Sequence, residues 1–302
     1  MGERPAEKYA LIHDLLTAGG REFHVSYLCH VAGVSRSGYY RWLGRASARS
    51  RREKVDYEQH LLIRDIFLKK RRKAGWRVIK MNLERQGVIM NHKKIRRLMQ
   101  KYGLVTQVRR RNPYKWLAKA TQEHRTAPNV LQRRFDQGTP YKVFSTDITY
   151  LHDGRGQRSY LSIIKDLASG EIVAHRVSAS LGMDLSLDVL TQAVARIGRK
   201  KLNGALIHSD QGFHYTHPIY SKRLAELGIA QSMSRRGNAL DNAPVESFFG
   251  HMKDELDITR CHSLDQVKAA IDEYIHNYNH HRYQWERKKM APVEYRNHLL
   301  AG

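Results

Sequence analysis

Three acidic residues, Asp147, Asp210 and Glu246, could do chemistry together in this chain. The two aspartates follow apolar, β-prone runs and the glutamate opens a predicted helix, so carboxylates far apart in sequence could converge at one end of a sheet. Carboxylate oxygens are the ligands that Mg²⁺ prefers. The three residues therefore predict a metal site made of oxygen ligands, without His or Cys.

A metal site of this type suits the cleavage of a phosphodiester, whose anionic oxygens repel nucleophiles and whose leaving alkoxide is poor. Two Mg²⁺ ions about 3.5–4 Å apart answer both problems, because one activates the attacking oxygen and the other stabilises the leaving oxygen. We expect Asp147 to bridge the two ions, and Asp210 and Glu246 each to complete the shell of one. Mn²⁺ is the expected substitute for Mg²⁺.

Each acid also has a structural interpretation on its own. Asp147 or Asp210 could cap a turn at the end of a strand, and Glu246 could be a first-turn glutamate favoured by the helix dipole. Three other acids near these segments are interpreted as turn or cap residues: Asp153, Asp166 and Asp241. Of these three, Asp166 is the most credible alternative catalytic candidate.

The spacing of the acids and the sequences around them resemble a known family. Thirty-five residues, 211–245, separate Asp210 from Glu246. This resembles the D,D(35)E core of bacterial insertion-sequence transposases and retroviral integrases. Three segments, 208–216, 231–238 and 241–250, are similar to those of OrfB, the second-frame transposase product of the insertion-sequence-three family. The resemblance extends over most of the chain, from about residue 24 to residue 297.

The resemblance implies an α/β, RNase H-like catalytic core that cleaves DNA and transfers a strand. Hydrolysis frees a 3′-hydroxyl at an element end, and this hydroxyl attacks a second phosphodiester without a covalent protein intermediate. The resemblance also implies a circular intermediate, at least a homodimer that pairs two ends of double-stranded DNA, and cooperation or frameshift fusion with the first-frame product OrfA. The leucine zipper of that product has no counterpart here, because no heptad pattern is sustained.

The predicted helix that Glu246 opens carries two further candidates. Glu246, Gly250 and Lys253 share one face because they are four and seven residues apart. Gly250 would leave room for a DNA backbone. Lys253 would reach a phosphate, as the resemblance implies, or face solvent as an ordinary surface lysine.

Three polar residues near the acids are expected to support the site. His208 could position a water or a phosphate, or it could pack beside the site as an ordinary strand residue. Asn238 and Asn242 could fix the loop before the helix through side-chain to backbone hydrogen bonds.

The positive charge of the chain is concentrated in its first half. The 302 residues carry a formal charge of +24. Residues 1–140 hold 32 Lys and Arg against 11 Asp and Glu, whereas residues 141–302 hold 21 against 18. This distribution predicts that the N-terminal half binds a polyanion and that the C-terminal half carries out the catalytic reaction.

Two helix pairs are predicted in the basic half. Residues 24–43 have the pattern of a compact helix-turn-helix. A second pair has Trp76, Ile79 and Leu83 on one helix and a second helix that is capped by Asn91, and it resembles the helix-turn-helix before the catalytic core of the family. The second helix carries a cationic stripe that suits DNA phosphates or is a solvated surface: Lys93, Lys94, Arg96, Arg97 and Lys101.

The predicted division of the chain has five parts. These are a helix-turn-helix at 1–50, a second, DNA-binding helix-turn-helix at 51–104, a basic linker at 105–140, the catalytic core at 141–258 and a helical extension at 259–302. The linker contains Arg109, Arg110 and Arg111, which we expect to lie along DNA. Strands are predicted at 141–151, 159–167, 171–178, 205–208 and 229–233.

Composition argues against several other classes of protein. No stretch approaches the ~18 uncharged apolar residues of a spanning helix, and the N-terminus lacks the pattern of a secretory signal, so we expect a bacterial cytoplasmic protein that is nucleoid-associated when bound to DNA. Cys29 and Cys261 are too few for a disulfide framework. Two rival functions remain: a non-catalytic DNA-binding regulator of transposition, and an RNase H-like nuclease without joining activity.

Overall fold

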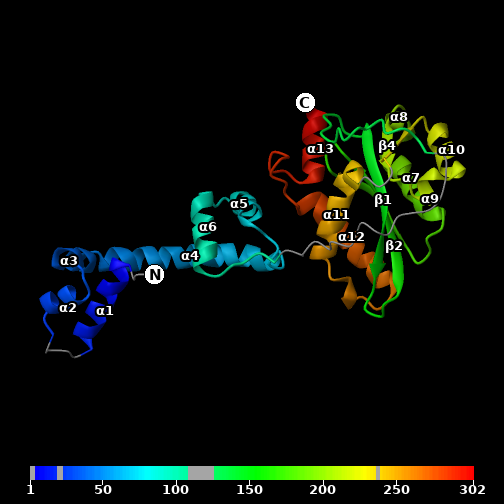
Figure 1. Cartoon of the computed structure of the whole chain (residues 1–302). Helices are drawn as coiled ribbons and strands as arrows, with labels where there is room; N and C mark the ends of the chain where they lie inside the picture. The colour runs from blue at the N-terminus through cyan, green and yellow to red at the C-terminus, as the bar shows by residue number, and fades with distance from the viewer. Residues whose placement is uncertain (1–3, 19–22, 108–125, 236–238) are drawn as a thin grey trace.

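The structure is a computed structural model that describes residues 4–18, 23–107, 126–235 and 239–302. Helices make up the N-terminal part, and a mixed sheet with helices on both faces makes up the C-terminal part. Figure 1 shows the helical part, coloured blue to cyan, extending away from the sheet along one long helix. Arg109, Arg110, Arg111 and Asn238 lie outside the described residues.

The first three helices form a small unit with its own core. They are α1 (Pro5–Thr17), α2 (Val25–Val31) and α3 (Arg36–Gly44). Ile12, Cys29 and Tyr39 are buried where the three helices meet. Ser35 caps α3, because its side chain accepts a hydrogen bond from the Gly38 backbone N–H (3.1 Å). The helix pair predicted over residues 24–43 is confirmed, and α1 packs against it.

The next three helices form a second unit, the helix-turn-helix unit. They are α4 (Ala46–Lys69), α5 (Trp76–Arg85) and α6 (His92–Lys101). Ile63, Ile79 and Ile95, one from each helix, are fully buried together. The Asn91 side chain caps α6 by accepting a hydrogen bond from the Lys93 backbone N–H (2.8 Å). The predicted α5–α6 pair and its cap are therefore confirmed.

Sequence periodicity does not predict α4, the longest helix of the described part. Its apolar side chains lie on several sides: Phe67 is buried against the unit, whereas Leu61, Leu62 and Leu68 are exposed. A helix without a single apolar stripe gives no clear periodic signal. Its stability comes from packing one face against α5 and α6 rather than from its pattern.

A five-stranded sheet with strand order β3-β2-β1-β4-β5 forms the centre of the C-terminal part. Strands β1 (Val143–His152), β2 (Arg158–Asp166) and β3 (Ile172–Ser178) pair antiparallel, whereas β4 (Leu206–Ser209) and β5 (Ala230–Met233) continue the sheet in parallel with β1. The five predicted strands are confirmed. With its covering helices, this sheet has the RNase H-like arrangement that the resemblance implies.

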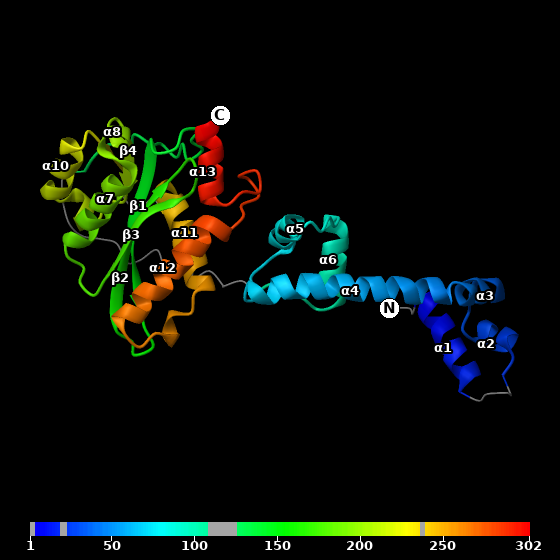
Figure 2. The same ribbon diagram turned by 180° about the vertical axis from the view of Figure 1, so that it is seen from behind.

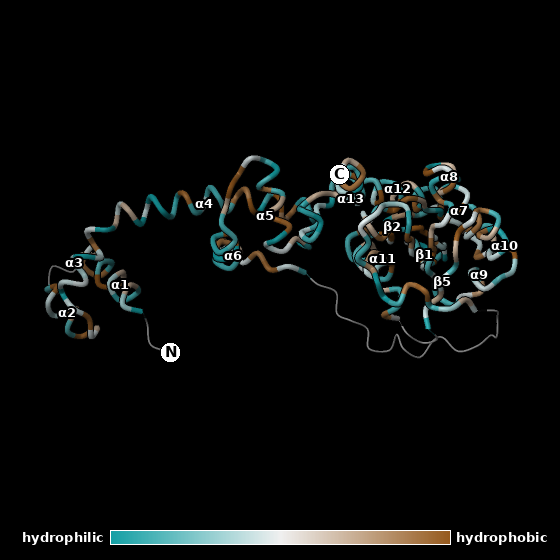
Figure 3. Tube along the Cα trace, turned by 90° about the horizontal axis from the view of Figure 1, so that it is seen from above, coloured by the Kyte–Doolittle hydropathy of each residue, from teal (hydrophilic) through white to brown (hydrophobic). Residues whose placement is uncertain are grey.

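Helices cover both faces of the sheet. One face packs on α7 (Asp184–Ile197), α8 (Arg199–Leu202), α9 (Phe213–Thr216) and α10 (Pro218–Glu226) through residues such as Phe144 and Ile164. The other face packs on α11 (Ala243–Glu255) and α12 (Leu264–His281) through Leu161 and Ile163. Figure 2 gives the view from behind, and Figure 3 shows the strands between α11 on one side and α7, α9 and α10 on the other.

Short elements complete the chain. Two 3-10 helices, η2 (Ala239–Asn242) and η3 (Ile258–Arg260), flank α11, and α13 (Pro292–Ala301) follows α12. Arg296 of α13 forms an ion pair with the fully buried Glu171 (2.7 Å), next to β3, so the C-terminal helix is fixed to the sheet. No helix in the described part of the chain is long and apolar enough to cross a membrane.

The second half of the predicted linker lies against the edge strand β5. Backbone N–H groups of Val130 and Leu131 donate to the Ser232 hydroxyl (3.0 and 3.1 Å), and Leu131 is buried. This attachment brings Arg133 beside the loop that precedes α11. Residues 126–135 are therefore part of the folded C-terminal part.

Asp241 in η2 accepts the Arg235 backbone N–H (3.1 Å), as its interpretation as a turn or cap residue implies, and it is also an ion-pair centre. The fully buried carboxylate accepts hydrogen bonds from the Arg133 Nε (2.6 Å) and the Arg235 Nε (3.0 Å). Asp153 and Asp166 also serve turns, since they accept the backbone N–H groups of Arg155 and Ser169 (2.9 Å each). Asp241 therefore joins three separate segments ahead of α11.

We predict that Asp241→Asn destabilises the C-terminal part by about 2 kcal/mol at pH 7, the usual cost of losing hydrogen bonds to a charged group. Hydrogen bonds from Arg235, helped by Arg133, hold the pKa of Asp241 below its ordinary value. A lowered pKa contributes stability above the ordinary carboxyl pKa of about 4, and this contribution is lost as the pH falls below it.

Calorimetric unfolding of both proteins at pH 7 and pH 3 checks this prediction. The difference in transition temperature is expected to be large at pH 7 and to shrink at pH 3. A difference that is equal at both pH values would mean that the carboxylate charge of Asp241 does not stabilise the fold.

Candidate active site and nucleic-acid interface

The pairing of β1 with β4 brings two of the three acids next to each other. Asp147 lies in the middle of β1, and Asp210 directly follows β4. Ser145 pairs with His208 in the parallel register, so Asp147, two residues further along β1, lies level with Asp210, which is two residues further on and just past the end of β4.

The negative charges of both carboxylates affect the pKa of Tyr215 in α9. Burial raises the pKa of its phenol well above the ordinary value, and the negative charges of Asp147 and Asp210 raise it further. A charge can act in this way only from nearby. The phenol is therefore a neutral neighbour of the acid pair, and it lies within 3.3 Å of the Thr146 hydroxyl.

A tight turn fixes the position of Asp210. Its Oδ1 accepts a hydrogen bond from the Gly212 backbone N–H (2.8 Å). A Cβ on Gly212 would lie only 2.8 Å from the same oxygen, so glycine is required for this close approach. In β1, the Asp147 Oδ1 accepts the backbone N–H of Ile148 (2.8 Å).

Helix α11, which carries Glu246 in its first turn, runs along the same face of β1 as Asp147. At the start of the helix, Asn242 accepts a hydrogen bond from the Ser145 hydroxyl and donates to the Thr146 carbonyl (3.3 Å). Near its other end, the Lys253 Nζ donates to the Thr149 hydroxyl (2.6 Å). Side chains alternate between the two faces of a strand, so Ser145, Asp147 and Thr149 lie on the same face of β1. The structure therefore places Glu246 on the helix that covers Asp147, with an exposed side chain.

The chemistry of these donors suits a hard divalent cation, because all three are carboxylates. Within the described ranges, no three His, Cys, Asp or Glu side chains are gathered into a group that could hold a metal ion. The arrangement is therefore an adjacent pair of aspartates and a glutamate on the neighbouring helix, not a closed cage. Mg²⁺ commonly takes one or two carboxylates and completes its shell with waters and substrate phosphates.

His208 is a packing residue in the structure. Its Nδ1 lies 2.8 Å from the Ser232 hydroxyl and its Nε2 lies 3.1 Å from the Ser234 hydroxyl. Burial lowers the pKa of the imidazole, so it stays neutral at pH 7. His208 therefore joins β4 to the end of β5 and has no ring nitrogen left for a water or a phosphate.

Gly250 lies on the exposed side of α11. No atom of the described chain comes within 4 Å of the position that a Cβ would take. Packing within the protein therefore does not require a glycine here.

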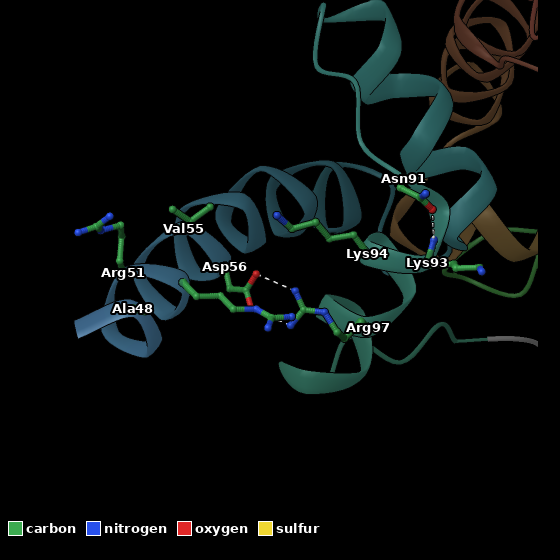
Figure 4. Close-up of a pocket in the computed structure, with 9 residues that line it drawn as sticks. Ala48, Arg51, Val55, Asp56, Asn91, Lys93, Lys94 and Arg97 are labelled. Atoms are coloured by element: carbon green, nitrogen blue, oxygen red, sulfur yellow. Dashed lines mark hydrogen bonds and ion pairs between the residues drawn. The ribbon is translucent and has the colours of Figure 1, made fainter. Parts of the chain in front are cut away.

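An open groove of about 620 Å³ lies between α4 and the start of α6. Figure 4 shows Asp56 on α4 facing Arg97 on α6, with dashed lines between them, and Lys94 of α6 extending toward α4. We call it the basic groove. It is lined by five basic side chains and one acid, in addition to Ala48, Val55 and Asn91: Arg51, Arg52, Lys93, Lys94, Arg97 and Asp56.

Asp56 neutralises only one of the five cations fully. Its buried carboxylate accepts two hydrogen bonds from Arg97 (2.7 Å each), which lower the pKa of Asp56. Within the part of the chain that the structure describes, Arg51, Arg52, Lys93 and Lys94 form no ion pair. A concave surface with unbalanced positive charge attracts polyanions strongly.

Only some of the residues predicted for DNA binding line the basic groove. Lys93, Lys94 and Arg97 line it, whereas Arg96 is exposed on α6 but does not. Sequence reasoning missed Arg51 and Arg52, because α4 was not predicted. The run of basic residues from Arg49 to Lys54 was the signal that could have drawn attention to them.

Known protein families match three stretches of the chain. Residues 137–239 and 246–300 match two families that are both described as integrase core domain. Residues 54–112 match an HTH-like domain family.

Individual proteins are similar over most of the chain. The InsK protein of insertion sequence element IS150 from Escherichia coli strain K12 is 35% identical, with 92% of this chain and 95% of that protein covered. Transposase InsF for insertion sequence IS3A from the same strain is 28% identical, with 93% and 96% covered. Among solved structures, the HTLV-2 integrase catalytic core domain in complex with magnesium has a TM-score of 0.41 and 16% identity, with 52% of this chain and 97% of that chain covered.

The family follows from these matches together with the sheet and the helix-turn-helix unit described above. The relative at 35% identity is covered almost from end to end, and the integrase core matches coincide with the strands and with α11 to α13. The chain belongs to the insertion-sequence-three family of transposases, enzymes of the polynucleotidyl transferase type that are built around an integrase core domain.

Proposed function

We propose that this transposase cleaves DNA strands and transfers them with Asp147, Asp210 and Glu246 as its catalytic acids. The observation that supports the proposal is the register of β1 with β4: Asp147 and Asp210 each lie two residues past the paired Ser145 and His208. Helix α11, which carries Glu246, is hydrogen-bonded to Ser145 and Thr149, the residues on either side of Asp147 on the same face of β1. Joining follows from a 3′-hydroxyl that is freed at an element end and then attacks a second phosphodiester.

The acids would hold divalent cations, Mg²⁺ or Mn²⁺, between β1, β4 and α11. When bound, such ions activate the attacking oxygen and stabilise the leaving oxygen. The residues of the chain keep the donors in place: Gly212 fixes Asp210, and Asn242 fastens the start of the helix that carries Glu246. Tyr215 stays protonated beside the aspartates, so it adds no further negative charge.

The basic groove would hold the phosphate backbone of duplex DNA. Four cations without an acidic partner in the described chain, Arg51, Arg52, Lys93 and Lys94, face the same concave surface. Arg96 beside the groove and Arg109, Arg110 and Arg111 would extend this contact. Binding of this kind is independent of sequence, because phosphates carry no base identity.

The five-part division of the chain belongs to the same proposal. The helical units up to residue 104 would bind the element end, and the integrase core would act on it. Two ends must be paired, so the active form would contain at least two copies of the chain, alone or with the first-frame product. Gly250 and Lys253 would lie along the DNA end beside Glu246.

The first test replaces one acid at a time. Asp147→Asn, Asp210→Asn or Glu246→Gln is expected to reduce cleavage and strand transfer by about a thousandfold or more, since a shared two-ion site loses a ligand. Duplex affinity should stay close to that of the wild type. A strand-transfer assay with a labelled element end in Mg²⁺ measures both steps.

Asp254→Asn is the matched control, because Asp254 lies two turns further along the same helix. It should leave joining unchanged. An acid variant that joins ends at a near-normal rate would show that this residue is wrongly assigned. Cleavage without joining in the wild type would favour the nuclease alternative.

The second test concerns the basic groove. Arg51→Ala with Arg52→Ala, or Lys93→Ala with Lys94→Ala, is expected to lower the slope of log affinity against log salt by about 1.8, because about 0.9 is lost for each phosphate contact. Fluorescence anisotropy with an element end and with an unrelated duplex checks this, and both duplexes should be affected equally.

The control for the groove is Lys69→Ala on the same helix, since Lys69 pairs with Asp65 (2.8 Å) outside the groove. It should not change the slope. A groove variant that weakens only the element end would mean that these side chains read bases rather than phosphates.

The third test separates two roles of Lys253. Lys253→Ala is expected to reduce strand transfer by about tenfold if its ammonium holds a phosphate beside the scissile one. Thr149→Val removes the hydrogen bond that joins this lysine to β1 but keeps the charge. If both variants reduce joining equally, attachment of the helix and not a DNA contact is responsible. Lys268→Ala, whose lysine pairs with Asp265, should change nothing.

A further inference from the structure

The loop between α12 and α13 contacts helix α5 of the helix-turn-helix unit. Trp285 in this loop meets Trp76 at the start of α5, with ring centroids 5.9 Å apart in an edge-to-face arrangement. The Lys289 Nζ lies 2.8 Å from a carboxylate oxygen of Glu84. In Figures 1 and 2 the loop before α13 extends toward α5.

A second ion pair lies beside these contacts. The Arg85 Nη2 lies 2.5 Å from a carboxylate oxygen of Glu294 in the first turn of α13, and the guanidinium lies 4.6 Å from the centroid of the Tyr283 ring. We call this contact surface the dock. It consists of three residues on α5 and four on the C-terminal side: Trp76, Glu84 and Arg85, with Tyr283, Trp285, Lys289 and Glu294.

The receiving loop is built rigidly on the integrase core. Gln284 pairs with Met290 across the loop, with the Gln284 N–H donating to the Met290 carbonyl (3.1 Å). Arg287 reaches back to the Leu167 carbonyl (3.4 Å) and covers Gly170, where a Cβ would meet the guanidinium at 2.8 Å. The loop therefore presents a fixed surface to α5.

The same region is connected to the helix that carries Glu246. Glu255, the last residue of α11, forms an ion pair with Arg282 and accepts a hydrogen bond from the Tyr274 hydroxyl (2.9 Å). The Arg71 Nη1, just after α4, donates to the Glu255 carbonyl (2.7 Å). Arg282 directly precedes Tyr283 of the dock. The far end of the Glu246 helix is thus attached to both sides of the dock.

We propose that the dock is a positioning surface for strand transfer, which holds the helix-turn-helix unit of the same chain in register with the catalytic helix α11. This inference rests on the proposed function. DNA held in the basic groove is then presented to the acids at a fixed offset, because α5 packs on α4 and α6 within one core. The ion pairs of the dock are partly exposed, so added salt weakens the docking.

A charge exchange in the full-length chain tests the positioning role. Glu84→Lys or Lys289→Glu alone is expected to lower the rate of strand transfer at saturating DNA by about tenfold, as misplacement of a reacting group does. Duplex affinity should stay within about twofold, because neither residue lines the basic groove. Glu84 also pairs with Lys80 in α5, so all variants are made in a Lys80→Gln background. In that background the double exchange should restore the rate to within about threefold of the parent, since it re-forms the pair between α5 and the loop with reversed charges.

Glu226→Lys is the matched control, because Glu226 forms an exposed pair with Arg223 (3.0 Å) far from the dock in sequence. It should not affect strand transfer. Single exchanges that join ends normally, or a double exchange that fails to recover, would overturn the positioning role.

A crosslink tests the dock without any DNA chemistry. Glu84→Cys with Lys289→Cys places one thiol on each side of the dock, and a flexible bis-maleimide, which spans the gap that the shorter cysteine side chains leave, is expected to give an internally crosslinked monomer. A covalent dimer would overturn the assignment to the same chain, and the lack of any crosslink would overturn the dock itself. The result does not depend on catalysis, so failure of the proposed function would show separately as acid variants that still join DNA.

Discussion

The hydrogen-bond register between β1 and β4 is the constraint on which the site depends. Ser145 opposite His208 brings Asp147 level with Asp210, which directly follows the end of β4, and the two-residue alternation of β1 puts Asp147 on the face that α11 covers. A slip of one residue would turn Asp147 to the face covered by α7 and α9. Buried residues on both faces, such as Phe144 and Ile163, oppose that slip because it would expose them to the wrong partners.

Helix α11 is the second half of this arrangement, and it is fixed along its length. Asn242 binds β1 at one end, Lys253 binds it near the middle of the strand, and Glu255 is held by Arg282 at the far end. Val245, Phe248 and Met252 fill the space between helix and sheet. The exposed Glu246 therefore stands on a helix whose position is set by hydrogen bonds, an ion pair and apolar packing that do not involve Glu246 itself.

Much of this could be predicted from the sequence, because the signals are local. Alternating apolar residues predicted the strands, and the short side chain of Asn91 before an apolar, periodic segment predicted the cap of α6. Helix α4 could not be predicted, since its order comes from α5 and α6. The role of Asp241 was also hidden, because Arg133 lies 108 residues before it and only the fold brings the two together. The segment around Trp285 had no local pattern, and its partner Trp76 lies even further away along the chain than Arg133 does from Asp241.

The electrostatic contrast between the two parts has a structural basis. In the C-terminal part, basic side chains are committed to acids, as Arg296 is to Glu171 and Arg235 is to Asp241. In the basic groove, one buried aspartate, Asp56, lies among five cations. Its ion pair with Arg97 fixes that side chain but leaves most of the positive charge of the groove unbalanced. Part of the net charge of the front half is therefore gathered on a concave wall that two helices form.

In the described part of the chain, the length of α4 sets the distance between helix α3 at its start and the segment after α4 that contacts α11. Its 24 residues span about 36 Å at 1.5 Å per residue. Helix α3 adjoins its first turn, and Arg71, two residues past its last turn, touches the end of α11. This span is close to the pitch of B-form DNA, about 34–36 Å. A duplex lying parallel to α4 would therefore show the same groove, in the same orientation, at both ends of the helix.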